Sequence, residues 1–508
     1  MNQQWIKQIW TAMCFCLLCC GVCFAQQQGG SSTQITLANQ VALSARTAQS
    51  GSVTSQQAPV PGTTQSVNTL NSTVLTTGSY SQSVLSGKPL TGPLSLKEAV
   101  GRGLDYNLGA VGLSNASMAA HGQMRVARSI LLPNLNGNLR EAVQQTNLAT
   151  LGLRSNFIPQ IVGPYNYFDL RATLTQNVAD LTALNNYRSA QENLKAAQMA
   201  VKDAHDLVVL AVGGAYLQVI AAQARVESAK AQIETAKAVF DQNTQKRQVG
   251  LVAQIDANRS QVEYQTQRQR LTTLQNDLAK QRINLCRIIG LAPDTNLDLA
   301  DTVPYAAPPE LSYDDALRSA LETRADLKSA EAATRAAERT RSAAKFERLP
   351  SLAVAADYGV TGVNPAQSHG TFDVTGTLRF AIWQGGRTEG DIEQAQAALI
   401  QRQSELSEIR GRIQSELKDA FLDLEAATSQ VQVAESNRQV ARENLELTRQ
   451  RMEAGIADSV EVTQAQETVA TSDLDYITSL LSHNLAKLSL ARALGDAEDK
   501  LSAYLAIP

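Results

Sequence analysis

The sequence contains the same series of motifs twice. The paired motifs are 217 residues apart in the first part of each copy, and 204 or 205 residues apart further on. They are LSLKEAV at 94–100 with LSYDDAL at 311–317, LLPNL at 131–135 with RLPSL at 348–352, YFDLRATL at 167–174 with TFDVTGTL at 371–378, and AYLQVIAA at 215–222 with AFLDLEAA at 420–427. Such self-similarity indicates a tandem duplication. We therefore divide the chain into a first copy at 93–290, a linker at 291–310, a second copy at 311–495 and a tail at 496–508.

Each copy is predicted to contain a helix, a pair of short strands, a long helix, a single glycine and a return helix. The first helix of copy one begins at Ser95, which has capping-box spacing to Glu98. The strands are clearest in copy two, where Phe372, Val374 and Leu378 alternate with polar residues. The predicted strands are 135–144, 167–178, 352–360 and 372–382.

The long helices carry narrow apolar seams. Apolar residues recur at alternating steps of three and four over 406–434, and similarly over 194–211. With 5% aromatic and 18% charged residues, the composition favours elongated helices over a broad core. A helix over 180–248 would be on the order of 100 Å long, so it must pack lengthwise against others. The apolar segment 207–222 is short for a membrane span and its repeat partner at 412–427 is charged, so both are predicted to be buried in helix packing.

Residues 1–92 are expected to lie outside the repeated unit. Lys7, an apolar stretch and Ala25 predict a secretory signal peptide at 1–25. Five of the six cysteines lie in it, so the mature chain would keep only Cys286 and could form no intramolecular disulfide. A leader cysteine could alternatively carry a lipid, although the small residue that usually precedes such a cysteine is lacking. Residues 26–92 are rich in Ser, Thr, Gln and Gly, which predicts a disordered, low-complexity extension.

Four strands with one apolar face cannot close a barrel alone. An open sheet edge within lipid would leave backbone groups without hydrogen bonds. The chain therefore needs copies of itself. The smallest bacterial barrels have about eight strands, a number that two chains would reach, while three chains would give twelve and leave a lumen.

The motifs together resemble a known family over nearly all of 93–494. The helix-ending LPNL and LPSL, the paired strands, and VGLVAQID at 249–256 with its echo AGIADSVE at 454–461 are similar to the TolC family of outer-membrane efflux proteins. The resemblance implies a mixed α/β membrane protein, a homotrimer with a twelve-stranded transmembrane β-barrel in the outer membrane that continues into a coiled-coil tunnel of helical hairpins across the periplasm. It also implies an exit duct of a tripartite efflux or type I secretion system. The implied partners are a periplasmic adaptor (membrane fusion protein), an inner-membrane pump of RND or ABC type, and outer-membrane lipid.

The single glycines are predicted to be the turns at the far tips of two helical hairpins, because glycine tolerates the left-handed backbone that ends a helix. By resemblance, Gly250, Leu251, Gly455 and Ile456 at these tips form the periplasmic entrance and contact the adaptor. The simpler alternative is that both glycines only stop helices.

Carboxylates just past the turns are candidates for a pore gate. These are Asp256, Asp458 and Glu461. Three symmetric copies of Glu461 would form an acidic ring that favours cations. The alternative is a solvated carboxylate in the first turn of a helix, favoured by the helix dipole. Met452 and Ala457 stand where some family members carry a tyrosine and an arginine that lock the closed tip, so such a lock with Asp256 is not expected.

The sequence is also compatible with, but disfavours, two other classes of function. A periplasmic adaptor or coiled-coil scaffold without a barrel also uses long helical hairpins, but the alternating strands favour a barrel. An enzyme is disfavoured because His121, His205, His369 and His483 are isolated, and no nucleophile elbow, phosphate loop or metal-ligand spacing occurs. These histidines are expected at the surface or in helix seams, and no cofactor or metal is expected. The formal net charge of −3 gives no reason to expect nucleic acid as a partner.

Overall fold

The first copy consists of helices and strands in the predicted order. A computed structural model describes residues 53–58, 71–85, 88–90, 92–148, 159–302, 305–307 and 311–505. The predicted signal peptide lies outside these ranges, and the described residues belong to one structural unit. The elements of copy one are α3 (Leu96–Tyr106), α4 (Leu108–Ser129), β3 (Asn134–Asn147), β4 (Ile161–Ala179), α5 (Leu181–Gln248) and α6 (Gln254–Ile288).

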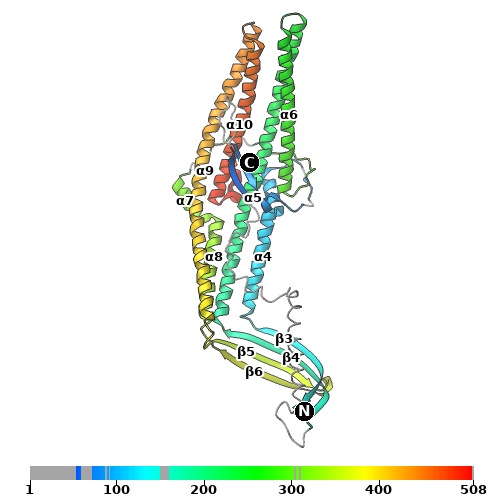
Figure 1. Ribbon diagram of the computed structural model, residues 1–508, viewed down its shortest axis with the longest axis vertical. Coiled ribbons are helices and arrows are strands. Elements are labelled where there is room, and N and C mark those ends of the chain that lie inside the picture. The colour runs from blue at the N-terminus through cyan, green and yellow to red at the C-terminus, as the bar shows by residue number, and fades with distance from the viewer. Residues whose placement is uncertain are drawn as a thin grey trace, which may run out of the picture. The chain divides into compact units, whose positions relative to one another are not determined.

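The second copy repeats this series, as Figure 1 shows. Its elements are α7 (Tyr313–Thr323), α8 (Ala325–Phe346), β5 (Ser351–Gly362), β6 (Ser368–Arg379), α9 (Arg387–Glu453) and α10 (Ser459–Leu494). Both α7 and α8 begin 217 residues after α3 and α4, which confirms the duplication. The predicted first helix is in fact two helices in each copy, divided at Asn107 and Arg324, whose backbones leave the helical region. Asn107 then caps α4, because its Oδ1 accepts the Gly109 N–H at 2.9 Å.

The four strands form one antiparallel sheet in the order β3-β4-β5-β6. The central pair joins the two copies, since β4 comes from copy one and β5 from copy two. Three strands extend beyond their predicted ends at both sides, so the expectation of short strands is wrong. The fourth was predicted to run to residue 382 but ends at Arg379.

Helix α5 provides the largest share of the core. It begins at Leu181, one residue after the predicted start, because the Asp180 side chain caps the helix by accepting the Ala183 N–H at 2.8 Å. Residues 208–217 are buried, and α3, α6 and α10 pack against this helix. By length and composition α5 could cross a membrane, but 72% of its most apolar stretch of 18 residues is buried inside the protein. The prediction of buried helix packing is confirmed for this segment, and for its repeat partner in α9, where Ile413, Leu417 and Leu424 are buried.

Two terminal predictions differ from the structure. Residues 71–85 lie within the predicted disordered extension, yet β2 (Asn71–Thr76) pairs with β1 (Val53–Ala58) and packs on α5 and α10. Tyr80 is buried, and Val74 packs against Gly214, where a Cβ would come within 2.5 Å of the valine side chain. The predicted tail contains α11 (Ala497–Leu505), whose Ala497 and Leu505 are buried. Residues 71–85 are polar overall, but Val74 and Tyr80 pack against the helices, whereas α11 buries a row of apolar side chains at helical spacing.

Candidate functional site

The first hairpin tip, between α5 and α6, ends in a Schellman motif. Gly250 has φ +78°, in the left-handed region that glycine adopts without a steric penalty. The Gly250 N–H donates to the Arg247 carbonyl at 3.0 Å, and the Leu251 N–H donates to the Lys246 carbonyl at 2.9 Å. These two bonds satisfy carbonyl groups that would otherwise be unpaired at the helix end.

The second tip, between α9 and α10, has the same geometry. Gly455 has φ +74°, its N–H donates to Met452 O at 3.2 Å, and the Ile456 N–H donates to Arg451 O at 2.8 Å. In both tips the residue after the glycine is apolar and exposed, Leu251 by 76% and Ile456 by 70%. The duplicated turns therefore present one apolar side chain each at matching positions.

The three gate candidates all have partners within their own hairpin. Asp458 caps α10, because its Oδ1 accepts the N–H groups of Val460 and Glu461 at 2.9 and 3.0 Å. Glu461 Oε2 lies 3.1 Å from Arg451 Nη1, across the tip. Asp256 Oδ1 lies 3.6 Å from Arg259 on the next turn of α6. The structure thus places Asp256 and Glu461 in the first turns of the return helices and Asp458 at the N-cap of α10. It also brings in Arg451, whose pairing with Glu461 depends on the turn geometry and could not be predicted from the sequence.

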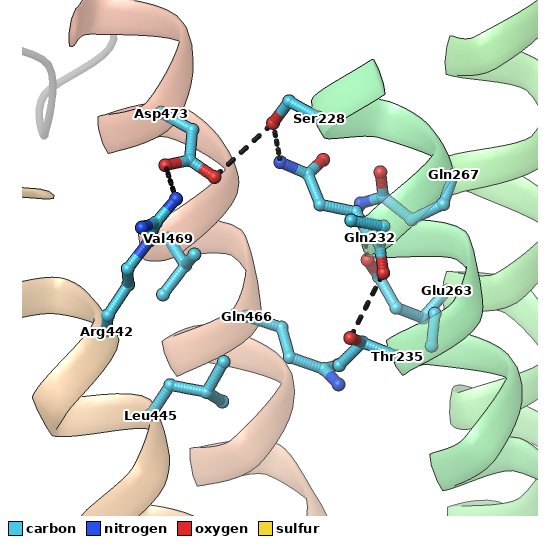
Figure 2. Close-up of a pocket in the computed structure, with 12 residues that line it drawn as sticks. Ser228, Gln232, Thr235, Glu263, Gln267, Arg442, Leu445, Gln466, Val469 and Asp473 are labelled. Carbon is cyan, nitrogen blue, oxygen red and sulfur yellow. Dashed lines mark hydrogen bonds and ion pairs between the residues drawn. The ribbon is translucent and has the colours of Figure 1, made fainter. Parts of the chain in front are cut away.

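A cavity of about 180 Å³ separates the two hairpins. Figure 2 shows α9 and α10 on one side and α5 and α6 on the other, with Ser228 bridging the gap to Asp473. The Ser228 hydroxyl donates to Asp473 Oδ2 at 3.3 Å, and Asp473 also accepts from Arg442 at 2.8 Å. Gln267 Oε1 and Gln466 Nε2 line this cavity and have no hydrogen-bond partner among the described residues. A polar group that enters the cavity, water included, can satisfy both amides.

Closer to the tips, a second and more open groove of about 490 Å³ lies between α6 and α10. Its lining includes Ile255, Val262 and Val460, which are exposed. Together with Leu251 and Ile456 these residues expose apolar surface near the tips, among polar neighbours such as Arg259, Glu263 and Glu467. Exposed apolar surface of this kind marks sites of contact with another molecule.

One face of the sheet is apolar and exposed. Residues directly opposite each other in register share a face. One row across the strands is Leu135, Leu174, Ala356 and Val374, and the next such row contains Tyr358 and Phe372. Further exposed apolar residues of this face are Leu139, Val143, Leu170 and Leu378.

The other face is polar and carries an ion-pair cluster. Arg171 Nε lies 3.3 Å from Asp169 Oδ1, its Nη1 pairs with Asp357, and its Nη2 donates to Thr371 Oγ1 at 3.3 Å. Asp169 also accepts from the Tyr167 hydroxyl at 3.1 Å. Arg171 was not predicted as a functional residue, although its alternation with apolar Leu170 and Ala172 was available as a signal.

An exposed aromatic and aliphatic segment follows the last strand. Phe380, Ile382 and Trp383 lie between β6 and α9, and Trp383 is 87% exposed. Aromatic side chains with one apolar body and one polar group prefer the boundary between lipid and water. This segment continues the apolar face of the sheet at the end from which α9 departs.

The histidines have no common site. His121 and His369 are exposed, His205 lies 3.2 Å from Glu498, and His483 is buried on α10. This distribution agrees with the expected surface and seam positions. Among the described residues no group of three or more His, Cys, Asp or Glu is arranged to hold a metal ion.

The fold is shared with solved outer-membrane channels. A membrane protein from Pseudomonas aeruginosa is 19% identical and superposes with a TM-score of 0.69, covering 78% of this chain and 93% of its own. The outer membrane protein VceC from Vibrio cholerae is 17% identical with a TM-score of 0.68, over 79% of this chain and 96% of its own. The CmeC outer membrane channel of Campylobacter jejuni is 14% identical with a TM-score of 0.69, over 87% and 94%. At these identities the likeness concerns the fold alone.

Sequence comparison shows the family itself. No curated protein has a significantly similar sequence. The family model described as outer membrane efflux protein, however, matches residues 113–291 and 316–496, one stretch in each copy of the duplication. Because these matches cover most of the chain and coincide with the repeated elements, the chain belongs to the outer membrane efflux protein family.

Proposed function

We propose that the chain forms a homotrimeric channel whose sheets close a twelve-stranded transmembrane β-barrel in the outer membrane. The two-faced sheet carries this proposal. Among the described residues β3 and β6 each pair on one side only, so both edges offer free backbone groups. A row of exposed Leu, Val, Tyr and Phe side chains suits lipid, whereas the Arg171 cluster on the opposite face suits a water-filled lumen.

The helical hairpins extend the channel into the periplasm. Helix α5 follows β4, and helix α9 follows β6 after residues 380–386, so the second strand of each copy leads into a helix of 68 or 67 residues. At about 1.5 Å per residue each helix reaches on the order of 100 Å. Three chains would place six such hairpins side by side, which supports a coiled-coil tunnel.

The hairpin tips are the proposed docking surface for a periplasmic adaptor. Leu251 and Ile456 are presented by two matching glycine turns beside the apolar groove between α6 and α10. Through the adaptor the channel would serve an inner-membrane pump of RND or ABC type, as the exit duct of a tripartite efflux or type I secretion system. Co-purification of the native partners after cross-linking distinguishes these two systems.

The gate is proposed to lie just above the tips. Glu461 is the first candidate, with Asp256 and Asp458 nearby, but each is held by an interaction within its hairpin. We expect channel opening to require that the ion pair between Arg451 and Glu461 breaks and that each side chain takes a new partner. If Glu461→Gln left both conductance and cation selectivity of the channel unchanged, the gate would lie elsewhere.

Channel formation itself is tested by reconstitution. The mature protein, purified in detergent and added to a planar lipid bilayer, should produce discrete ion-conducting steps. A protein that is extracted by salt alone and gives no conductance would contradict the proposal and favour a periplasmic scaffold.

A further inference from the structure

Arg171 lies across the polar face of the sheet rather than pointing away from it. It stands on β4, contacts Asp357 on β5, and donates to Thr371 on β6, two strands away. Its side chain is 28% exposed, which is low for an arginine on an open sheet face. The guanidinium is therefore held flat by partners on three adjacent strands.

Glycine at position 359 makes room for this arrangement. In register, Arg171 is opposite Gly359, and Gly359 is opposite Thr371. A Cβ at position 359 would come within 2.9 Å of the Arg171 Cα and 3.0 Å of its Cβ, closer than side chains tolerate. The strand between the arginine and the threonine thus has no side chain that could block the path.

The carboxylates around Arg171 outnumber the cations. Asp357 and Asp373 are directly opposite each other in register, an unfavourable pairing of like charges unless a cation lies nearby. Asp169 is the third carboxylate, and Arg140 is opposite it on β3. The band therefore holds three aspartates and two arginines per chain, and Arg171 contacts two of the three aspartates.

We propose that Arg171 determines the ion selectivity of the barrel lumen by neutralising this band of carboxylates. The inference rests on the proposed function, because the polar face lines a lumen only when copies of the sheet close with their apolar faces toward lipid. Every copy then contributes the same band at the same height, so a change at Arg171 acts three times at one level of the pore. Loss of the arginine leaves Asp169 and Asp357 without this partner, and a ring of uncompensated carboxylates attracts cations and repels anions.

The test compares charge variants in planar bilayers under a gradient of potassium chloride. Arg171→Gln should raise the ratio of cation to anion permeability by about twofold or more relative to the unsubstituted channel. Arg171→Lys keeps the charge and should leave the ratio near that of the unsubstituted channel. Arg318→Gln removes one positive charge from the exposed face of α7, outside the sheet, and should have no effect.

A second variant covers the case in which Arg171→Gln does not assemble. Asp357→Asn removes one carboxylate and leaves Asp169 to hold the arginine, so the permeability ratio should shift toward anions. The double variant Arg171→Gln with Asp357→Asn should return toward the original ratio.

The possible failures are distinguishable. If the unsubstituted protein forms no pore, the proposed function is contradicted. If it conducts and the permeability ratio is the same in the Arg171→Gln and Asp357→Asn channels as in the original, the proposed function stands and the role of Arg171 is overturned.

Discussion

Two ionisable residues on α10, Lys487 and His483, are buried inside the protein. Lys487 is fully buried, and its ammonium donates to the Ala306 carbonyl at 3.1 Å. Burial lowers the pKa of Lys487 to about 8. One turn earlier, the His483 ring packs against Tyr305 with 5.0 Å between ring centroids, and burial, with Lys487 nearby, lowers the pKa of His483 to about 4. Burial shifts both equilibria toward the uncharged form, yet Lys487 stays mostly charged at pH 7 because its pKa is still about 8.

Lys487 should therefore cost stability at neutral pH. The folded protein binds the Lys487 proton less tightly than the unfolded chain does. The loss in free energy of unfolding is therefore complete below pH 8 and diminishes as the pH rises toward 10.5. We expect Lys487→Met to raise the free energy of unfolding at pH 7 by at most about 3 kcal/mol, and by progressively less above pH 8. Lys202→Met, at an exposed position on α5, serves as control. Thermal unfolding of the helices at pH 7 and pH 10 measures both, and an equal gain at the two pH values would refute the assignment.

At the scale of elements, the chain uses glycine where a second segment must approach a helix closely. The Val74 side chain of β2 packs directly against Gly214 on α5, and Leu488 of α10 packs against the neighbouring Gly213. The corresponding positions of α9 are Lys418 and Asp419, so the second copy has no such contact surface. The two halves of the duplication have thus diverged at the place where residues 71–85 pack.

Substitution of Gly214 should release this N-terminal segment. A Cβ there would collide with Val74 at 2.5 Å, whereas a Cβ at Gly411 on α9 would meet no described atom beyond its own stretch of helix within 4 Å. Chymotrypsin cleavage after Tyr80, which is buried, should therefore accelerate in Gly214→Ala and remain slow in Gly411→Ala. Equal cleavage rates in the two variants would show that the segment does not depend on this contact.

The segment after β6 should sit at the boundary of the membrane. Trp383 is the only tryptophan outside the predicted signal peptide, so its fluorescence can be observed by itself in the mature protein. On reconstitution its emission should move to shorter wavelength and be quenched by lipids brominated near the headgroup, because an indole ring prefers the interface. Trp383→Phe should abolish the signal. Emission typical of water, with no quenching, would place this segment away from lipid.

At the scale of the whole molecule, the duplication predicted most of the architecture. The helix starting after Asp180, both glycine turns and all four strands follow from local patterns that occur twice. The docking of residues 71–85 could not be predicted, because their few apolar side chains carry no periodicity. For α11 a signal was available, since Ala497, Leu501 and Leu505 recur at helical spacing and are buried. The Arg171 cluster also escaped prediction, since it depends on the register between strands of different copies, and the Arg451–Glu461 pair depends on how the turn closes.

The central claim is that three copies of the chain close one barrel. Four strands with two unpaired edges require partners in lipid, and copies of the same sheet supply them. Native mass spectrometry of the mature protein, extracted from outer membranes in mild detergent, measures the number of chains directly. The account predicts the mass of three chains, which persists until heating dissociates the complex. A mass of one or two chains under the same conditions would contradict it.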